Sequence, residues 1–253
     1  MGRLGELVMK ALASPEVPDH LAALVQSGVR TALDVGCGDL SPLAVHRPDI
    51  VTVGVDSDGP ALERARRQEL HDHYLQGNFD TFTNQQLCAP IGGRKFDLVG
   101  CFGVIEHLPK HQGFELLRRM ESLSARYVIV DTPNGFVPQG PEYGNEAQRH
   151  LSGWFREEFE GHGYSVYGVT GTNIIRGYAA MPKHDFRYWA LVDAALARAL
   201  RTASWTRFSF GLVAIKDVRG VPARLGDRLG SQPSQDAEVV DPRDGRRVES
   251  GGA

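Results

Sequence analysis

Apolar residues along this chain of 253 residues occur in two patterns, short continuous runs and helix-like repeats. They recur at steps of three and four over 58–70 and 114–123, which predicts a helix in each segment. The short runs are typical of strands that a parallel sheet buries on both faces. We predict strands at 31–35, 50–55, 74–76, 96–101, 127–130, 164–169 and 208–216. Strands that alternate with helices in this way predict an α/β fold.

The first predicted strand ends in the string D-V-G-C-G at residues 34–38. Gly36 and Gly38 can adopt positive φ and let a ligand approach the bare backbone. A strand that passes through such a turn into a helix presents unpaired N–H groups, which favour a ligand with an anionic or carboxylate group. The second predicted strand ends at Asp56, where a carboxylate can accept hydrogen bonds from ribose hydroxyls. Together the two features predict a site for a nucleotide-like cofactor.

Two residues indicate which cofactor the turn favours. A dinucleotide-binding turn has the form G-x-G-x-x-G, and Ser41 stands here in place of the third glycine. Asp34 would also lie near the pyrophosphate of a dinucleotide and repel it. S-adenosylmethionine (SAM) carries no phosphate, and its sulfonium and amino acid groups suit a nearby carboxylate. The turn therefore favours SAM over NAD.

The string D-V-G-C-G resembles motif I of the class I SAM-dependent methyltransferases. F-D-L-V at 96–99 and E-H-L at 106–108 resemble motif IV and its flank in the group that acts mostly on small molecules. The resemblance covers roughly residues 31–216. It implies a Rossmann-like, doubly wound sheet of seven strands with the last strand antiparallel.

The resemblance also implies which residues bind the cofactor. The family usually places an acidic residue after the third strand, against the adenine amino group, and an apolar residue against the ring. Asn78 takes the acidic position here and can still accept a hydrogen bond through its amide carbonyl. The expected cofactor-binding residues are Asp34, Gly36, Cys37, Gly38, Asp56, Ser57, Asn78, Phe79 and Cys101.

Three residues are candidates for catalysis, namely Glu106, His107 and His150. The first two follow the fourth strand, at the sheet edge where α/β proteins bind ligands. His150 ends a long loop, 136–150, and could close over a methyl acceptor. Because histidine can act as a base near neutral pH, we expect His150 to be the general base and His107 to orient the loop or the donor. An acceptor that is already a carboxylate would need no base.

No metal site is expected from the sequence. Catechol-type methyltransferases hold a metal ion through an Asp at the end of the fourth strand, with further Asp and Asn nearby. In this chain that strand ends in G-C-F at 100–102, so the pattern is missing.

The composition of the chain limits the kinds of partner that we expect the protein to bind. The formal net charge is −3, so no overall basic character suggests nucleic acid, and no N-P-P-Y-like string is present to hold a flipped base. Three cysteines are too few for a disulfide framework, which favours the cytoplasm. No apolar run approaches the ~20 residues that span a bilayer. We expect the protein to act on a small molecule and to bind neither nucleic acid nor a membrane. The sequence leaves open whether the protein forms a homodimer.

The resulting prediction is methyl transfer from SAM to an oxygen or nitrogen of a small molecule, such as a specialised metabolite or an envelope glycan precursor. Two alternatives remain open. One is an NAD-dependent oxidoreductase, which Ser41 and Asp34 disfavour. The other is a non-catalytic SAM-binding module that keeps the glycine turn but has no acceptor site.

The expected organisation is a helical cap at 1–28, a methyltransferase domain at 29–216 with an insertion at about 171–201, and a largely disordered tail at 217–253. The tail has no aromatic residue and is rich in residues that favour disorder. Two local predictions also bear on the structure. Ser152 is expected to cap a helix over 153–160, and His71 is expected to lie in solvent at the end of a helix.

Overall fold

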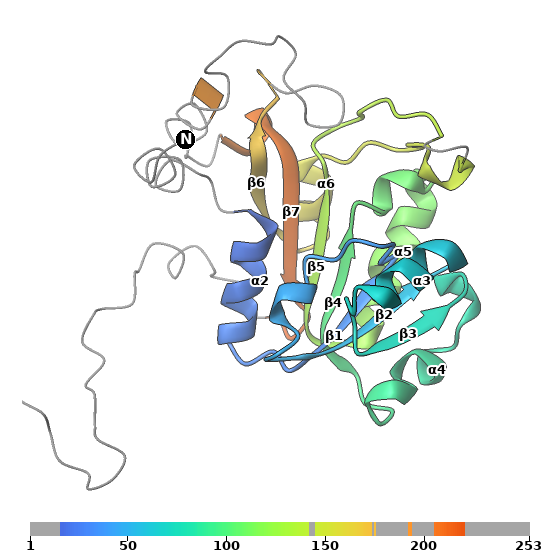
Figure 1. The fold of residues 1–253 in the computed structure, drawn as a ribbon. Coiled ribbons are helices and arrows are strands. Elements are labelled where there is room, and N and C mark those ends of the chain that lie inside the picture. Colours follow the sequence, from blue (N-terminus) through green and yellow to red (C-terminus); the bar gives the residue numbers. More distant parts are fainter. Residues whose placement is uncertain (1–15, 142–144, 174, 176–191, 194–204, 221–253) are drawn as a thin grey trace, which may run out of the picture. The chain divides into compact units, whose positions relative to one another are not determined.

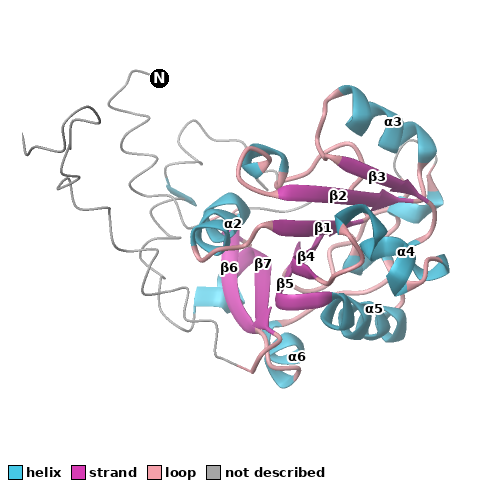
Figure 2. Ribbon diagram, turned by 90° about the horizontal axis from the view of Figure 1, so that it is seen from below, coloured by secondary structure: helices cyan, strands magenta, loops and turns pink. Residues whose placement is uncertain are grey.

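The computed structural model describes residues 16–141, 145–173, 175, 192–193 and 205–220. The described strands form a seven-stranded sheet in the order β3-β2-β1-β4-β5-β7-β6. Figure 1 and Figure 2 show this sheet from two directions. The strands are β1 (Thr31–Val35), β2 (Val51–Asp56), β3 (His73–Gln76), β4 (Phe96–Phe102), β5 (Ser124–Pro133), β6 (Ser165–Thr172) and β7 (Ser209–Asp217).

Helices connect the strands and pack against the sheet (Figure 2). Helix α3 contacts β2 and β3, α5 contacts β4 and β5, and α6 contacts β6 and β7. Over the described residues, no helix has both the length and the apolar character needed to cross a bilayer. The α-helices are α2 (Val17–Gln26), α3 (Gly59–Arg67), α4 (Asn84–Cys88), α5 (Lys110–Leu123) and α6 (Arg156–Gly161).

The register of the parallel strands brings their carboxyl ends to one edge of the sheet. Val35 at the end of β1 pairs with Val55 of β2 on one side and with Cys101 of β4 on the other. The turns that follow these three strands therefore lie next to one another. This is the edge at which open α/β sheets bind ligands.

Burial in the core explains why the continuous apolar runs of the sequence form strands. All five residues of β1 are buried, because β2 and β4 flank this strand. The core continues through α5 to Trp154, whose side chain is fully buried. There Gly113 of α5 faces the indole so closely that a Cβ at this position would lie 2.3 Å from it. The absence of a side chain at Gly113 thus allows the helix and the indole to pack together.

The predicted sheet is confirmed. Seven strands are present, and the last, β7, runs antiparallel to both β5 and β6. A helix also covers part of the expected N-terminal cap, namely α2. The first fifteen residues of the expected cap, most of the expected insertion at about 171–201 and the tail from 221 lie outside the described residues.

The predicted cap of the sixth helix is wrong. Helix α6 begins at Arg156 with Phe155 as its N-cap, and the Glu158 carboxylate accepts a hydrogen bond from the Phe155 N–H. Ser152 instead accepts a hydrogen bond from the indole N–H of Trp154 at 3.0 Å. The serine hydroxyl is buried beside the turn that follows β4, so it is not available to begin a helix.

Candidate active site

The glycine turn after β1 exposes backbone to a cavity. Gly36 and Gly38 have φ angles of +71° and +52°, a region that strains residues with a side chain. The Gly36 N–H donates a hydrogen bond to the Val55 carbonyl, which ties the turn to β2. A Cβ on Gly38 would meet no atom within 4 Å. The turn therefore presents bare backbone to open space, as expected from the sequence.

The cavity at this sheet edge has a volume of about 310 Å³. It is bounded by the turns after β1, β2, β3 and β4 and by a short piece of the 136–150 loop. Among the expected cofactor residues, those that line it are Gly36, Gly38, Asp56, Ser57, Asn78 and Phe79. The sequence reasoning missed other lining residues, which include Gly77, Asp80, Gly103, Val104, Ala147 and Gln148.

Asp56 is held in place at the end of β2. One carboxylate oxygen accepts a hydrogen bond from the Gly38 N–H at 2.7 Å, and the other accepts one from the Asp58 N–H at 2.7 Å. A carboxylate oxygen can accept more than one hydrogen bond. The carboxylate is therefore oriented by the protein while it keeps capacity for two hydroxyl donors of a ligand.

The turn after β3 combines an amide, an aromatic ring and a carboxylate. The Asn78 amide oxygen accepts a hydrogen bond from the Asp80 N–H at 3.0 Å, so Asn78 also stabilises the turn. The guanidinium carbon of Arg119 lies 4.4 Å from the centre of the Phe79 ring. Asp80 lines the cavity two residues after Asn78, and its carboxylate forms an ion pair with Arg119 at 3.4 Å. The sequence could have indicated Asp80 as a lining residue, because it directly follows Phe79 in the turn after β3.

Asp34 occupies a different environment from the one expected. It is buried, accepts a hydrogen bond from the Ser41 hydroxyl at 2.5 Å and does not line the cavity. Burial raises the pKa of Asp34 to about 7, with the Ser41 hydrogen bond acting in the opposite direction and the charge of Asp56 adding to the increase. Cys37 and Cys101 are likewise buried and outside the lining. Direct contact of these three residues with a cofactor stays a prediction.

The expectation that His71 lies in solvent is wrong. Its side chain is fully buried, and Nε2 lies 3.5 Å from a carboxylate oxygen of Asp34. Burial lowers the pKa of His71 to about 4, with a further decrease from Arg47 that is partly offset by Asp72. The imidazole is therefore expected to be neutral at pH 7, and it lies against Asp34 and Gly54 of the two neighbouring strands.

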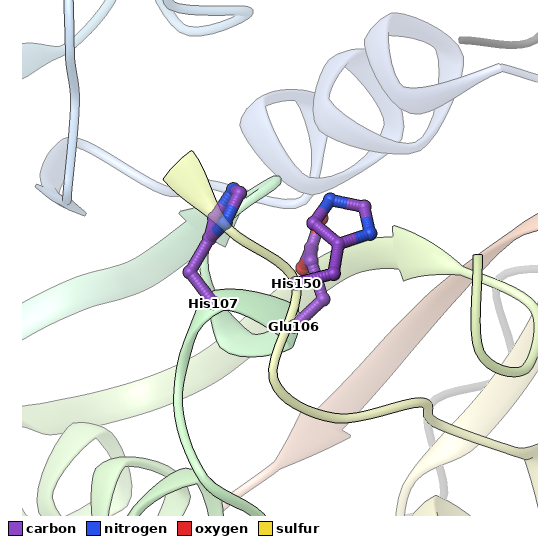
Figure 3. A group of neighbouring side chains, drawn as sticks. All are labelled: Glu106, His107 and His150. Atoms are coloured by element: carbon purple, nitrogen blue, oxygen red, sulfur yellow. The ribbon is translucent and has the colours of Figure 1, made fainter. Parts of the chain in front are cut away.

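The three candidate catalytic residues come together in space. One potential ligand atom from each of Glu106, His107 and His150 lies within 4.8 Å of the other two. Figure 3 shows Glu106 and His107 on the turn after β4 and His150 on the separate loop that faces it. His107 also lines the cavity. We call these three residues the Glu–His–His cluster.

Backbone hydrogen bonds hold the two segments of the cluster together. The carbonyl oxygen of Glu106 accepts hydrogen bonds from the N–H groups of Leu151 and Ser152, at 2.8 and 3.0 Å. The indole N–H of Trp154 also points to the Ile105 carbonyl at 3.3 Å. These bonds fix the end of the 136–150 loop against the turn after β4. His150 is therefore positioned by a buried, hydrogen-bonded frame.

Burial also perturbs the carboxyl groups near the cluster. It raises the pKa of Glu106 to about 7, although hydrogen bonds from its own backbone and from Thr132 act in the opposite direction. Burial together with the charges of Glu106 and Glu16 raises the pKa of Asp131 to about 7. Strongly perturbed groups beside a cavity are a recognised mark of a functional site.

The sheet order, the glycine turn and the acidic end of β2 define a class I methyltransferase fold. Residues 33–126 match the family model described as a methyltransferase domain. This match confirms the resemblance to SAM-dependent methyltransferases over that segment. No curated protein matches the chain.

Several solved structures are similar to the chain. One is a SAM-dependent methyltransferase from Archaeoglobus fulgidus, with 16% identity and a TM-score of 0.48 over 84% of this chain and 93% of that one. Another is a plantazolicin methyltransferase in complex with SAH, with 17% identity and a TM-score of 0.47 over 82% and 83%. A third is magnesium protoporphyrin IX methyltransferase from Synechocystis PCC 6803 with bound SAM, with 17% identity and a TM-score of 0.42 over 79% and 77%.

The charge of the cavity fits the cofactor of this family. Asp56 and Asp80 line it, and among the described lining residues there is no Lys or Arg. A dinucleotide would bring a pyrophosphate that such a lining leaves without a cationic partner. SAM brings a positively charged sulfonium and no phosphate.

Proposed function

We propose that this protein transfers the methyl group of SAM to an oxygen or nitrogen atom of a small molecule. The observation that carries the proposal is the position of His107. This residue lines the same cavity as the glycine turn, Asp56 and Phe79, and it also belongs to the Glu–His–His cluster. A donor bound by the turns and an acceptor beside the cluster would therefore share one space.

Each part of the chain has a separate task in this proposal. SAM supplies a methyl group on a positively charged sulfur. Asp56 accepts hydrogen bonds from the ribose, and the backbone at 36–38 binds the amino acid end. Phe79 packs against adenine through the ring face that Arg119 leaves available. These contacts align the methyl group with the acceptor, and the 136–150 loop excludes water from the space between them.

The cluster is proposed to handle the acceptor's proton. The Nδ1 atom of His150 lies 2.6 Å from the Val137 carbonyl oxygen, so in the neutral ring Nδ1 carries the hydrogen and Nε2 carries a lone pair. That lone pair can accept a proton or bind a cation. As a base or as a cation ligand, His150 would make a hydroxyl acceptor more nucleophilic. A carboxylate acceptor would need neither a base nor a cation.

Other parts of the proposal concern organisation and location. The domain is proposed to cover 29–216, with α2 as part of a preceding helical cap. All three cysteines of the chain are buried and free, which supports a cytoplasmic location.

The proposal is tested by binding and by transfer of label. Calorimetric titration of the full chain with SAM and, separately, with NADH is expected to show binding of SAM alone. Methyl-labelled SAM is then incubated with the protein and a panel of alcohols, phenols, amines and carboxylates of small size. Transfer to at least one class supports the proposal. Binding of SAM with no transfer indicates a non-catalytic module, and binding of NADH alone indicates an oxidoreductase.

A further inference from the structure

The Glu–His–His cluster has the composition of a metal site. It offers two imidazole nitrogens and one carboxylate oxygen from residues that are buried or half-buried, all within 4.8 Å of one another. Two histidines and one carboxylate on one side of an ion leave further coordination positions open, as in the facial triads that bind first-row transition metals. The cluster stands beside the cavity through His107, so the open positions would face a ligand bound there.

The hydrogen bonds of both histidines match those of metal ligands. Nδ1 of His150 contacts the Val137 carbonyl oxygen at 2.6 Å, and Nδ1 of His107 contacts the Arg149 carbonyl oxygen at 3.2 Å. A histidine that binds a metal through one nitrogen commonly donates the other N–H to a backbone carbonyl, which fixes its tautomer. The same arrangement occurs here twice, and both carbonyls belong to the loop that carries His150.

The third member offers a carboxyl group in a buried place. Glu106 is 4% exposed, and one of its carboxylate oxygens accepts a hydrogen bond from the Thr132 hydroxyl at 2.9 Å. In the part of the chain that the structure describes, no Lys or Arg forms an ion pair with this carboxylate. A buried carboxylate without a cationic partner is costly. A bound cation would offset that cost.

From these three observations we propose that Glu106, His107 and His150 bind one divalent first-row transition metal ion. The two imidazoles favour Fe²⁺, Co²⁺ or Zn²⁺ over Mg²⁺ or Ca²⁺, which prefer ligand sets made of oxygen. Ligands of one such ion at about 2.1 Å lie about 3.0–3.4 Å apart, so the three side chains would close by about 1.5 Å around it. Rotation of the imidazoles and of the Glu106 side chain supplies that movement.

The role of the ion rests on the proposed function and narrows its acceptor to a hydroxyl compound. A bound divalent metal lowers the pKa of a coordinated hydroxyl, as it does for coordinated water. The acceptor proton leaves to solvent, the oxygen forms a bond to the methyl carbon, and the carbon–sulfur bond of SAM breaks with its electron pair retained by sulfur. The charge of the sulfonium is thereby neutralised. His150 then acts as a metal ligand rather than as the general base.

The experiment measures metal binding separately from catalysis, with Co²⁺ as the probe. The full chain is treated with chelator, dialysed and titrated with CoCl₂, while visible absorption and calorimetry are recorded. One Co²⁺ per chain is expected. His107→Ala, His150→Ala and Glu106→Gln should each weaken binding by roughly a hundredfold or more, beyond what loss of an outer-shell partner costs. His111→Ala, an exposed histidine on α5, is the matched control and should bind as the wild type does.

The melting temperature of each variant without metal shows whether the variant folds. Glu106→Gln is used because glutamine has nearly the same shape as glutamate. Co²⁺ should raise the melting temperature of the wild type and of His111→Ala, but not that of the three cluster variants. Failure of the wild type to bind Co²⁺ would overturn the proposal. Equal binding by the wild type and all three cluster variants would overturn it as well, because the ion would then bind elsewhere.

The metal proposal and the proposed function can fail independently. Co²⁺ binding at the cluster with no methyl transfer to any acceptor would support the metal site and count against the methyltransferase proposal. Methyl transfer to a hydroxyl acceptor at an undiminished rate in excess chelator would support the methyltransferase proposal and overturn the role of the ion in the reaction, while the Co²⁺ titration decides separately whether the cluster binds metal.

Discussion

The imidazoles of His107 and His150 stand edge to face with ring centroids 4.8 Å apart, although they belong to separate segments of the chain. His107 follows β4, and His150 ends the loop that leads towards α6. The Glu106 carbonyl joins the two segments by accepting hydrogen bonds from the backbone just after His150. Backbone hydrogen bonds of the fold therefore hold the two imidazoles next to each other. Substitution of either histidine tests the function of the pair.

The first prediction concerns turnover by the histidine pair. His150→Ala and His107→Ala should each lower turnover on a hydroxyl acceptor by roughly 10²–10⁴, because the acceptor proton then has no base or metal ion to promote its loss. His150 is not in the cavity lining, so His150→Ala should leave SAM affinity nearly unchanged. Turnover and calorimetric affinity are measured side by side, with His111→Ala as control. Full turnover in both variants would show that the acceptor is already ionised.

The second prediction concerns Asp56. Its carboxylate is held by the Gly38 N–H and is expected to accept hydrogen bonds from the ribose. Loss of hydrogen bonds to a charged group typically costs ~1.5–3 kcal/mol, so Asp56→Ala should weaken SAM binding about tenfold to a hundredfold. Calorimetry checks the value. Asp39→Ala, on the same turn but paired with Arg64 on the surface, should bind SAM as the wild type does. Unchanged affinity in Asp56→Ala would place the ribose elsewhere.

The third prediction concerns the pH dependence of stability and Asp34, because burial raises the pKa of this carboxyl group from its ordinary value to about 7. The folded protein keeps this proton up to about pH 7, whereas the unfolded chain releases it above about pH 4. The contribution of Asp34 to the free energy of unfolding is therefore complete below the pKa of this group in the unfolded chain. It is lost as the pH rises through the pKa of the group in the folded protein. Between pH 5 and 8 this contribution should decrease by about 2–3 kcal/mol.

The measurement is the free energy of unfolding of the cofactor-free protein in urea at pH 5 and pH 8. Asp34→Asn keeps an acceptor for the Ser41 hydroxyl and cannot ionise, so its difference between the two pH values should be smaller than that of the wild type. Asp39→Asn is the control for removal of an exposed carboxylate. Identical pH dependence in the wild type and Asp34→Asn would contradict the raised pKa.

The fourth prediction links the core to the cluster through Gly113. A Cβ at this position would lie 2.3 Å from the indole of Trp154, whose N–H is directed at the Ile105 carbonyl beside Glu106. Overpacking of this kind costs about 1–3 kcal/mol, so Gly113→Ala should lower the melting temperature and, by shifting the turn, reduce turnover. Gly161→Ala, where a Cβ meets nothing within 4 Å, should do neither. A stable and fully active Gly113→Ala would contradict the packing argument.

The fifth prediction concerns the C-terminal segment from Ser231, which lies outside the described residues. It contains no aromatic residue and no apolar period. A chain that ends before Ser231 should retain the melting temperature and turnover of the full chain, because this composition cannot bury enough apolar surface to offset ordering. Thermal denaturation and the labelled-SAM assay measure both. A clear decrease in either would show that the segment contributes to fold or function.

The sequence by itself determined the fold and the approximate position of the cavity at the sheet edge. Apolar runs are local signals, because a strand buried on both faces needs a continuous row of apolar residues. The glycines at 36 and 38 are local as well, since their φ angles exclude most other residues. Asp56 could be found because strand ends in a parallel sheet meet at one edge. The E-H-L string then located the fourth strand end beside them.

Only the tertiary structure decided which side chains share an environment. Nothing local in the sequence indicates that Asp34 is buried against His71, or that Asp80 rather than Asp34 reaches the cavity. The meeting of His150 with Glu106 and His107 likewise depends on long-range packing. Trp154 fits against Gly113, and the backbone after His150 bonds to the Glu106 carbonyl. Such distances are set by close packing and hydrogen bonding across the whole domain, which no short stretch of sequence encodes.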